Sequence, residues 1–128
     1  MDQQHESQSR SAKIATSAVK LLHEYTGRGP TKARTTIDES VVMILLADTL
    51  TRGERTLVAH GRADRVLQVR YDYQTAMRED LVGIVERELD REVIAFMSQN
   101  HIDPDLAVEV FVLKPNEPSL EALHPPNS

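Results

Sequence analysis

Hydrophobic residues recur at steps of three and four in two long stretches of the chain. The first stretch predicts a helix from about Ser11 to Thr26, and the second predicts a helix from about Ala63 to Leu89. Between them, Thr51 and Glu54 form a Thr-x-x-Glu capping box, so a short helix is expected from there to about Ala59. The two long stripes consist of Ile14, Ala18, Leu21, Leu22 and Tyr25, and of Val66, Val69, Tyr73, Met77, Leu81, Ile84 and Val85.

Four other stretches have the pattern of β-strands. Lys32–Ile37 alternates, whereas Val41–Ala47 is apolar throughout, which favours a strand that is central in a sheet or buried on both faces. Val93–Ile102 and Leu106–Leu113 are also strand-like, and Asp103-Pro104-Asp105 between them has the residue types of a tight turn. The sequence therefore predicts two hairpins.

The resulting order, α-β-β-α-α-β-β, indicates a small α+β domain with a four-stranded antiparallel or mixed sheet and helices on one face. We expect the domain to span residues 10–114, between a disordered polar tail at 1–9 and a disordered Pro-rich tail at 115–128. The apolar run Val41–Ala47 needs cover on both sides or a central position, so we expect the four strands to form one sheet with the long helix against it. We therefore expect Val110→Asp to unfold the domain by burying an unpaired charge.

Composition narrows the functional classes. The chain has 128 residues, which fits one domain, and its net charge of −5 argues against a nucleic-acid binder. It contains no Cys, which excludes disulfides, thiolate zinc sites and cysteine nucleophiles. The polar N-terminus lacks a signal-peptide pattern, and the longest apolar run, Val41–Ala47, is far shorter than the roughly 20 residues that span a bilayer. We therefore expect a cytoplasmic protein.

The segment Gly27-Arg28-Gly29-Pro30 must turn sharply after the first helix. Backbone N–H groups in such a turn can form a concave anion site, to which Arg28, Lys32 and Arg34 would add charge. The alternative is a helix stop with solvated basic side chains. The spacing matches neither a Walker motif nor a dinucleotide fingerprint.

Glu109 lies between Val108 and Val110 in an otherwise apolar strand. A buried carboxylate needs a partner, and Arg34 is a candidate if the strands are neighbours. The alternative is that Glu109 is exposed, on an edge or on a solvent-facing row of the strand. His101 with Asp103 and Asp105 could hold a metal loosely, but these read better as ordinary turn residues. No nucleophile elbow or catalytic triad is recognisable, so we expect no enzyme activity, no metal and no cofactor.

The long helix of about 27 residues would measure roughly 40 Å, against about 17–20 Å for a typical strand. It must either kink near Gly83 or pack against something beyond the sheet. Self-association is the simplest answer, so we expect a homodimer; the alternative is an extra stretch of solvated helix.

Several segments together resemble the bacterial MpsC family. They are Gly27–Pro30 after a helix, the hairpin that follows, Leu50-Thr51 with Glu54, and Val108–Leu113 near the end. The resemblance covers about residues 10–114. Relatives often have Pro after the capping Thr, where this chain has Arg52.

The resemblance implies a non-enzymatic accessory or regulatory protein of a membrane cation or inorganic-carbon transport system. Such a protein would bind the cytoplasmic face of a transport protein and would not enter the membrane. The alternative hypothesis is a sensor of small anions or nucleotides that uses the Gly27–Pro30 turn.

Overall fold

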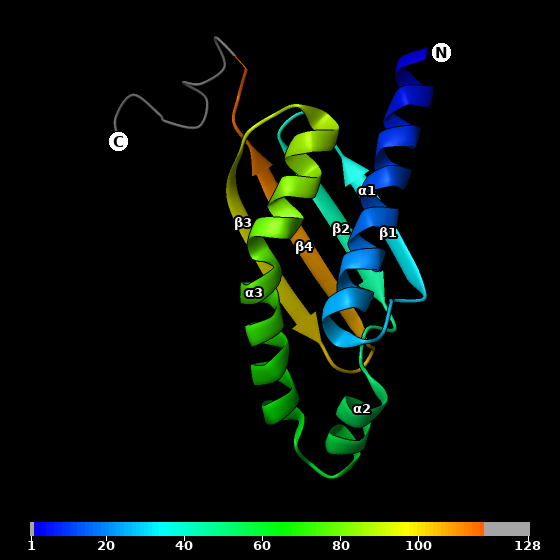
Figure 1. Cartoon of the computed structure of the whole chain (residues 1–128), viewed down its shortest axis with the longest axis vertical. Helices are drawn as coiled ribbons and strands as arrows, with labels where there is room; N and C mark the ends of the chain where they lie inside the picture. The colour runs from blue at the N-terminus through cyan, green and yellow to red at the C-terminus, as the bar shows by residue number, and fades with distance from the viewer. Residues whose placement is uncertain (1, 117–128) are drawn as a thin grey trace, which may run out of the picture.

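The computed structural model describes residues 2–116, with side chains from residue 9 onward. It confirms the α+β class and the predicted order of elements (Figure 1). The tail expected at 115–128 lies almost entirely outside the described residues. The elements are α1 (Asp2–Thr26), β1 (Lys32–Ile37), β2 (Val41–Ala47), α2 (Arg52–Ala59), α3 (Ala63–Leu89), β3 (Val93–His101) and β4 (Leu106–Leu113).

The four strands form one antiparallel sheet in the order β1-β2-β4-β3. The two hairpins lie side by side and are joined through β2 and β4, which are therefore the central strands. Phe111 on β4 lies opposite Val42 on one side and Phe96 on the other. Because opposed residues point to the same face, the register assigns each paired strand residue to one of two faces, and only Ile94 of β3, at a register shift between Val93 and Ala95, is left out of the pairing there.

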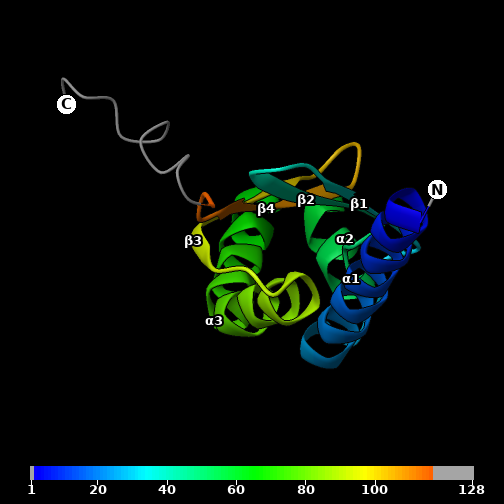
Figure 2. The ribbon, with the colours of Figure 1, turned by 90° about the horizontal axis from the view of Figure 1, so that it is seen from above.

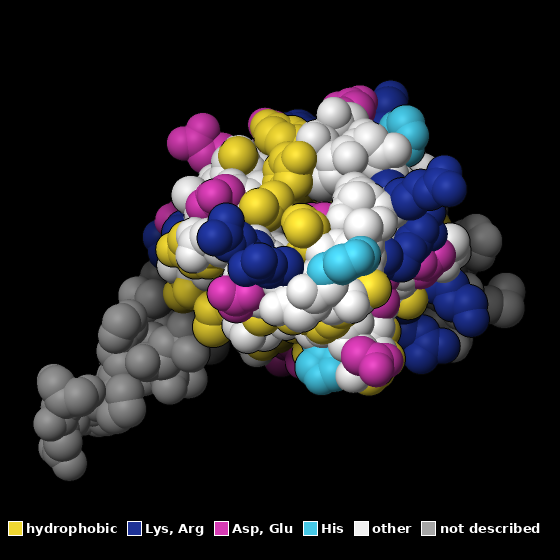
Figure 3. All heavy atoms as spheres, turned by 90° about the horizontal axis from the view of Figure 1, so that it is seen from below, with side chains coloured by type: hydrophobic (Ala, Val, Ile, Leu, Met, Phe, Trp, Pro, Cys, Tyr) yellow, Lys and Arg dark blue, Asp and Glu magenta, His cyan; other side chains and the backbone are white. Residues whose placement is uncertain are grey.

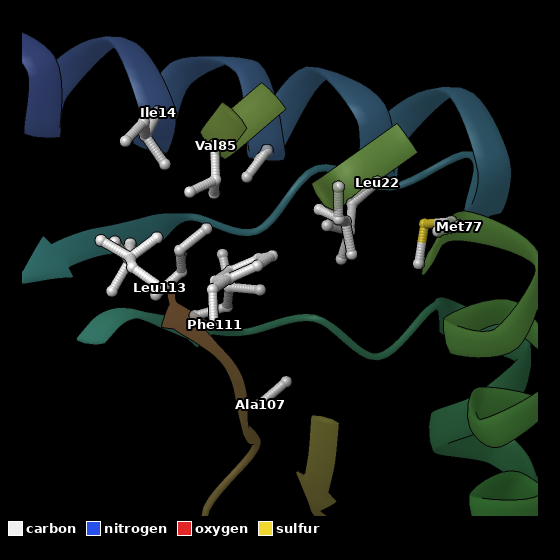
Figure 4. Close-up of a cluster of buried hydrophobic side chains, with 12 residues drawn as sticks. Ile14, Leu22, Met77, Val85, Ala107, Phe111 and Leu113 are labelled. Carbon is white, nitrogen blue, oxygen red and sulfur yellow. The ribbon is translucent and has the colours of Figure 1, made fainter. Parts of the chain in front are cut away.

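Helices α1 and α3 cover one face of this sheet, which Figure 2 shows from above. Side chains from both helices meet those of β2 and β4 in a continuous core (Figure 4). Phe111 is fully buried, and its ring centroid lies 5.1 Å from that of Phe96. The remaining core is aliphatic, as the aromatic content of 4% predicts. The buried cluster contains Ile14, Ala18, Leu22, Val42, Ile44, Leu46, Met77, Leu81, Val85, Ala107, Phe111 and Leu113.

Within residues 2–116, no helix lies on the other face of the sheet (Figure 2). In β2 the two rows differ sharply, because Ile44 is fully buried whereas Met43 and Leu45 are 42% and 43% exposed. The strand is central, as one of the two predicted arrangements requires, but it is covered on one face only. Val110 pairs with Met43 and so belongs to the uncovered row, where it is half-buried. The expectation that Val110→Asp buries a charge in the core is therefore wrong.

Helix α1 begins at Asp2, not near Ser11 as its hydrophobic pattern predicts, so it includes most of the segment 1–9 that the sequence pattern assigns to a tail. Its buried positions, Ile14, Ala18 and Leu22, lie on the predicted stripe and face the sheet. The hydrophobic pattern could not predict this early start, because Asp2–Arg10 contains no apolar residue that could belong to a stripe.

Helix α3 runs past the end of the sheet and packs there against α2 (Figure 1). Its buried stripe differs from the predicted one at two turns, since Arg70 and Gln74 are buried while Val69 is 41% exposed. Packing on α2 gives the overhanging part of α3 a neighbour within the same chain. The length of the helix therefore no longer argues for self-association.

Candidate functional site

The Gly27–Pro30 turn ends α1 by the expected route. Gly27 has φ of +80°, a conformation that favours glycine, and its N–H donates to His23 O at 2.9 Å. Gly29 has no positive φ; a Cβ there would lie 3.3 Å from Val19 Cγ1, so close packing favours glycine at this position. Pro30 is buried and continues the chain toward β1.

Arg28 is bound to Asp48, the residue that follows β2. The Arg28 guanidinium donates to the Asp48 carboxylate through Nη2 and to Asp48 O through Nε at 3.2 Å. Asp48 itself has φ of +61° and also lies near Arg55, with 3.5 Å between Oδ1 and Nη1. The charge of Arg28 is thus balanced within the chain, and the arginine links the end of α1 to the end of β2.

Lys32 and Arg34 do not converge with Arg28. Both are exposed on β1, opposite Ala47 and Leu45, and so lie on the uncovered face of the sheet. Viewed from the end of the molecule that carries α2, lysine and arginine side chains gather on the side of α1 and β1 (Figure 3). The six residues of the predicted anion site are therefore divided between a glycine turn with a paired arginine and the edge of an open sheet.

A buried ion pair joins α2 to α3. Arg70 and Glu54 are 3% and 7% exposed, and Arg70 Nη1 lies 3.2 Å from Glu54 Oε1. The same carboxylate oxygen accepts from Thr51 N at 2.8 Å, while Glu54 N donates to Thr51 Oγ1 at 3.1 Å. Glu54 therefore completes the predicted capping box and neutralises a buried arginine. Within the described residues, Glu54 Oε2 and Arg70 Nε are buried without a hydrogen-bond partner.

Glu109 is buried on the helix-covered face at 1% exposure. Its partner is Ser98 on the adjacent strand β3, whose hydroxyl donates to Glu109 Oε2. Burial raises the pKa of the Glu109 carboxyl to about 7, although the Ser98 hydrogen bond and the charge of Arg70 act to lower it. Arg34, the candidate partner predicted from the sequence, is separated from β4 by β2 and lies on the opposite face of the sheet. That prediction is therefore wrong.

A shallow pocket of about 210 Å³ opens between α3 and β3, beside this carboxylate. Ser98 and Gln74 form part of its wall, and Arg78 lies at its edge with its guanidinium carbon 5.8 Å from the centroid of the Phe96 ring. A second hollow of about 330 Å³ shares Arg78 and Phe96 and continues along the β3 edge. The two form one surface groove beside a buried titratable group.

The tip of the β3–β4 hairpin is fixed to the segment that leads into α2. One oxygen of the Asp105 carboxylate accepts from Thr49 N at 3.1 Å and Thr49 Oγ1 at 3.0 Å, and the other accepts from Leu50 N at 3.0 Å. His101 Nδ1 lies 2.7 Å from Pro104 O. Asp105 thus organises the backbone, and in the described part of the chain no group of three or more His, Asp or Glu is placed to hold a metal ion.

A comparison with protein families identifies the family of this chain. The model of the family described as "Na+-translocating membrane potential-generating system (MpsC)" matches residues 6–115, most of the chain. The chain belongs to the MpsC family. Neither the curated proteins nor the solved structures gave a match. In the part of this MpsC-family chain that the structure describes, no helix combines the length and hydropathy needed to cross a membrane.

Sequence reasoning about this MpsC-family chain located Glu54 and Glu109 but missed Arg70. Arg70 and Gln74 lie one helical turn apart, between Val66 and Met77, on a single line of buried positions along α3. A search restricted to apolar residues passes over them and shifts the stripe to Val69. The signal that could have found them is a pair of long polar side chains, Arg70 and Gln74, at the spacing of the apolar stripe. A glutamate in the first turn of the neighbouring helix, Glu54, offers a partner for the arginine.

Proposed function

We propose that this domain is a non-enzymatic accessory or regulatory protein of a membrane transport system for cations or inorganic carbon. It acts at the cytoplasmic face by binding other proteins, and it does so as a homodimer. The observation that carries the proposal is membership of the MpsC family over residues 6–115. The description of that family names a Na+-translocating, membrane-potential-generating system.

Two surface features support a binding role. One face of the sheet has exposed apolar side chains at Met43 and Leu45, and a groove runs between α3 and β3 past Arg78. The two buried glutamates are both engaged within the chain: Glu54 pairs with Arg70, and Glu109 accepts from Ser98. Exposed apolar area without a surrounding catalytic constellation is typical of interaction surfaces.

The alternative, an anion sensor at the Gly27–Pro30 turn, gains no support from the geometry. The charge that would attract an anion is already paired, since Arg28 binds the carboxylate of Asp48. Lys32 and Arg34 lie on the open face of β1 rather than around the turn.

The test is genetic and physiological. The coding sequence is deleted from the native host, and the membrane potential is measured with a voltage-sensitive dye in Na+ medium and in K+ medium, alongside bicarbonate uptake. We expect a loss of potential or uptake that the wild-type chain restores. Unchanged potential and unchanged uptake in the deletion strain would overturn the proposal.

A further inference from the structure

We infer that the open face of the sheet is the interface of a homodimer, in which the sheets of two copies of this chain pack face to face. By the open face we mean the surface opposite α1 and α3 in Figure 2. The inference deepens the self-association part of the proposed function and is independent of the transport role.

The composition of the open face argues for burial. The register places on it Lys32, Arg34 and Thr36 from β1, Val41, Met43, Leu45 and Ala47 from β2, Leu106, Val108, Val110 and Val112 from β4, and Ala95, Met97, Gln99 and His101 from β3. On β2 and β4 this row has no polar side chain. Met97 is 53% exposed and Leu45 is 43% exposed. An antiparallel sheet that faces water normally presents polar residues on that face, so this face has the pattern of a covered one.

The size of the face suits a second copy. Four strands about 4.8 Å apart and about 25 Å long present a flat footprint of roughly 500 Å². The apolar part of this footprint is centred on β2 and β4, and the polar row of β1 lies at its edge. Interdigitating side chains bury more accessible area than a flat footprint, which brings the face toward the ~800 Å² per partner of a specific interface. Sheets that stack in this way bury their inner rows about 10 Å apart.

The charges at the β1 edge fit a twofold partner. Lys32 and Arg34 are exposed near the start of β1, whereas Asp38 and Glu39 are exposed in the turn at its end. That turn is fixed, because Asp38 Oδ1 accepts from Ser40 N at 2.9 Å and Val41 N at 2.7 Å. A twofold axis that lies in the interface across the strands reverses the partner's strands. It therefore sets the basic start of each β1 over the acidic turn of the other, twice per dimer.

Two alternatives to this dimer can be distinguished by experiment. The first is that the open face is covered by the segment 117–128, which follows β4 and carries Leu120 and Leu123. The second possibility is that the chain self-associates through the other exposed apolar residues, Leu57, Leu67 and Tyr71 on α2 and α3, and leaves the open face free.

The purified full chain is examined by sedimentation equilibrium from low micromolar to several hundred micromolar concentrations, with circular dichroism as the check on folding. We expect a dimer of twice 14.4 kDa. Leu45→Lys should be folded and monomeric. Leu67→Lys is the matched control, because it makes the same change at a leucine that is 40% exposed on α3, and it should stay dimeric.

The orientation has its own test. Lys32→Glu should weaken the dimer about three- to tenfold, because it puts two acidic groups at each end of the interface. Adding Glu39→Lys should restore the wild-type dissociation constant, since the exchanged charges again attract each other.

Three results would overturn the inference. The first is that the full chain is monomeric at all concentrations. If a chain truncated to residues 1–116 dimerises in that case, residues 117–128 cover the face in the full chain. Dissociation by Leu67→Lys but not by Leu45→Lys is the second, and it would place the interface on α2 and α3. The third is a dimer that survives both changes. None of these readouts involves transport, so failure of the proposed function leaves them unaffected.

Discussion

Arg70 Nη1 on α3 lies 3.2 Å from Glu54 Oε1 on α2, and both side chains are almost completely buried. Arg70 Nη1 also donates to Thr49 O at 3.3 Å, just before the start of α2. The short helix thus attaches to the end of α3 that extends beyond the sheet through a charged contact. A buried arginine of this kind tolerates loss of its partner poorly.

We therefore expect Glu54→Gln to destabilise the fold by about 3–5 kcal/mol, because it leaves the Arg70 charge buried and uncompensated. Glutamine keeps a side-chain acceptor for the capping box, so the loss reports the ion pair rather than the cap. Urea denaturation followed by circular dichroism measures the change. The double variant Glu54→Gln/Arg70→Met should recover most of the loss, since no buried charge remains.

An exposed ion pair serves as the control. Lys13 Nζ lies 3.9 Å from Glu88 Oε1, and its side chain is 68% exposed, so Lys13→Ala should cost less than about 1 kcal/mol. Equal losses from Lys13→Ala and Glu54→Gln would contradict a desolvated pair between α2 and α3.

The Arg28–Asp48 contact predicts a different series. Asp48 has φ of +61°, which Asn tolerates better than Ala does. Asp48→Asn removes only the partly solvated charge and should cost about 1 kcal/mol or less, whereas Asp48→Ala should cost about 1 kcal/mol more. Chemical denaturation of the two variants checks the order, and an equal loss in both would show that the backbone conformation at position 48 relaxes.

Arg28→Ala tests the turn directly. Because Arg28 is bound to Asp48, we expect a loss of about 1 kcal/mol in folding stability, and we expect inorganic phosphate to leave the melting temperature of the wild type unchanged. A phosphate-dependent rise in the wild-type melting temperature that Arg28→Ala abolishes would restore the anion-site hypothesis.

The order of elements was predictable because each element carries a local signal: a stripe, a capping box, a glycine turn or an apolar run. The sequence could not predict which face of the sheet the helices cover. Val41–Ala47 is apolar in both rows, so its sequence cannot tell whether a covering layer comes from the same chain or from another. Only the placement of α1 and α3 on one face resolves the two rows of β2.

The candidate site was only partly predictable, for a reason that concerns chain topology. Glu109 stood out as a carboxylate among valines, but its partner depends on which strand is adjacent and which face is shared. The hairpin that places Ser98 opposite Glu109 was predicted, yet its register was not. Arg70 is charged and so gives no apolar signal. Its burial depends on Glu54, which lies 16 positions away on another helix and neutralises its guanidinium.

The two rows of β4 provide a paired prediction. Phe111→Ala removes a fully buried ring next to Phe96 and should cost about 3–5 kcal/mol. Val110→Asp changes the adjacent residue on the open face, so the monomer should remain folded by circular dichroism while its self-association is lost. Unfolding by Val110→Asp at the same denaturant concentration as Phe111→Ala would mean that the open face is part of the folded core of each chain.

Glu109 predicts a pH dependence of stability with a definite sign. Its pKa is raised from 4.5 to about 7 in the folded protein, so between these values the folded state binds more protons than the unfolded state. The contribution of this carboxyl to the free energy of unfolding is therefore more favourable at low pH than at high pH, and it is greatest below pH 4.5. This contribution declines as the pH rises to about 7 and is constant above that value. The shift corresponds to about 3 kcal/mol across the window.

Glu109→Gln isolates this contribution, because glutamine keeps an acceptor for the Ser98 hydroxyl but does not titrate. We expect the wild type to lose about 3 kcal/mol relative to Glu109→Gln between pH 4.5 and pH 8, as measured by urea unfolding at each pH. The other groups, including Asp38, whose pKa is lowered by backbone N–H donors of Ser40 and Val41, titrate equally in both proteins and cancel in the difference. A difference that does not vary with pH would show that Glu109 ionises normally, and one that grows in the opposite direction would show that the Arg70 charge outweighs burial.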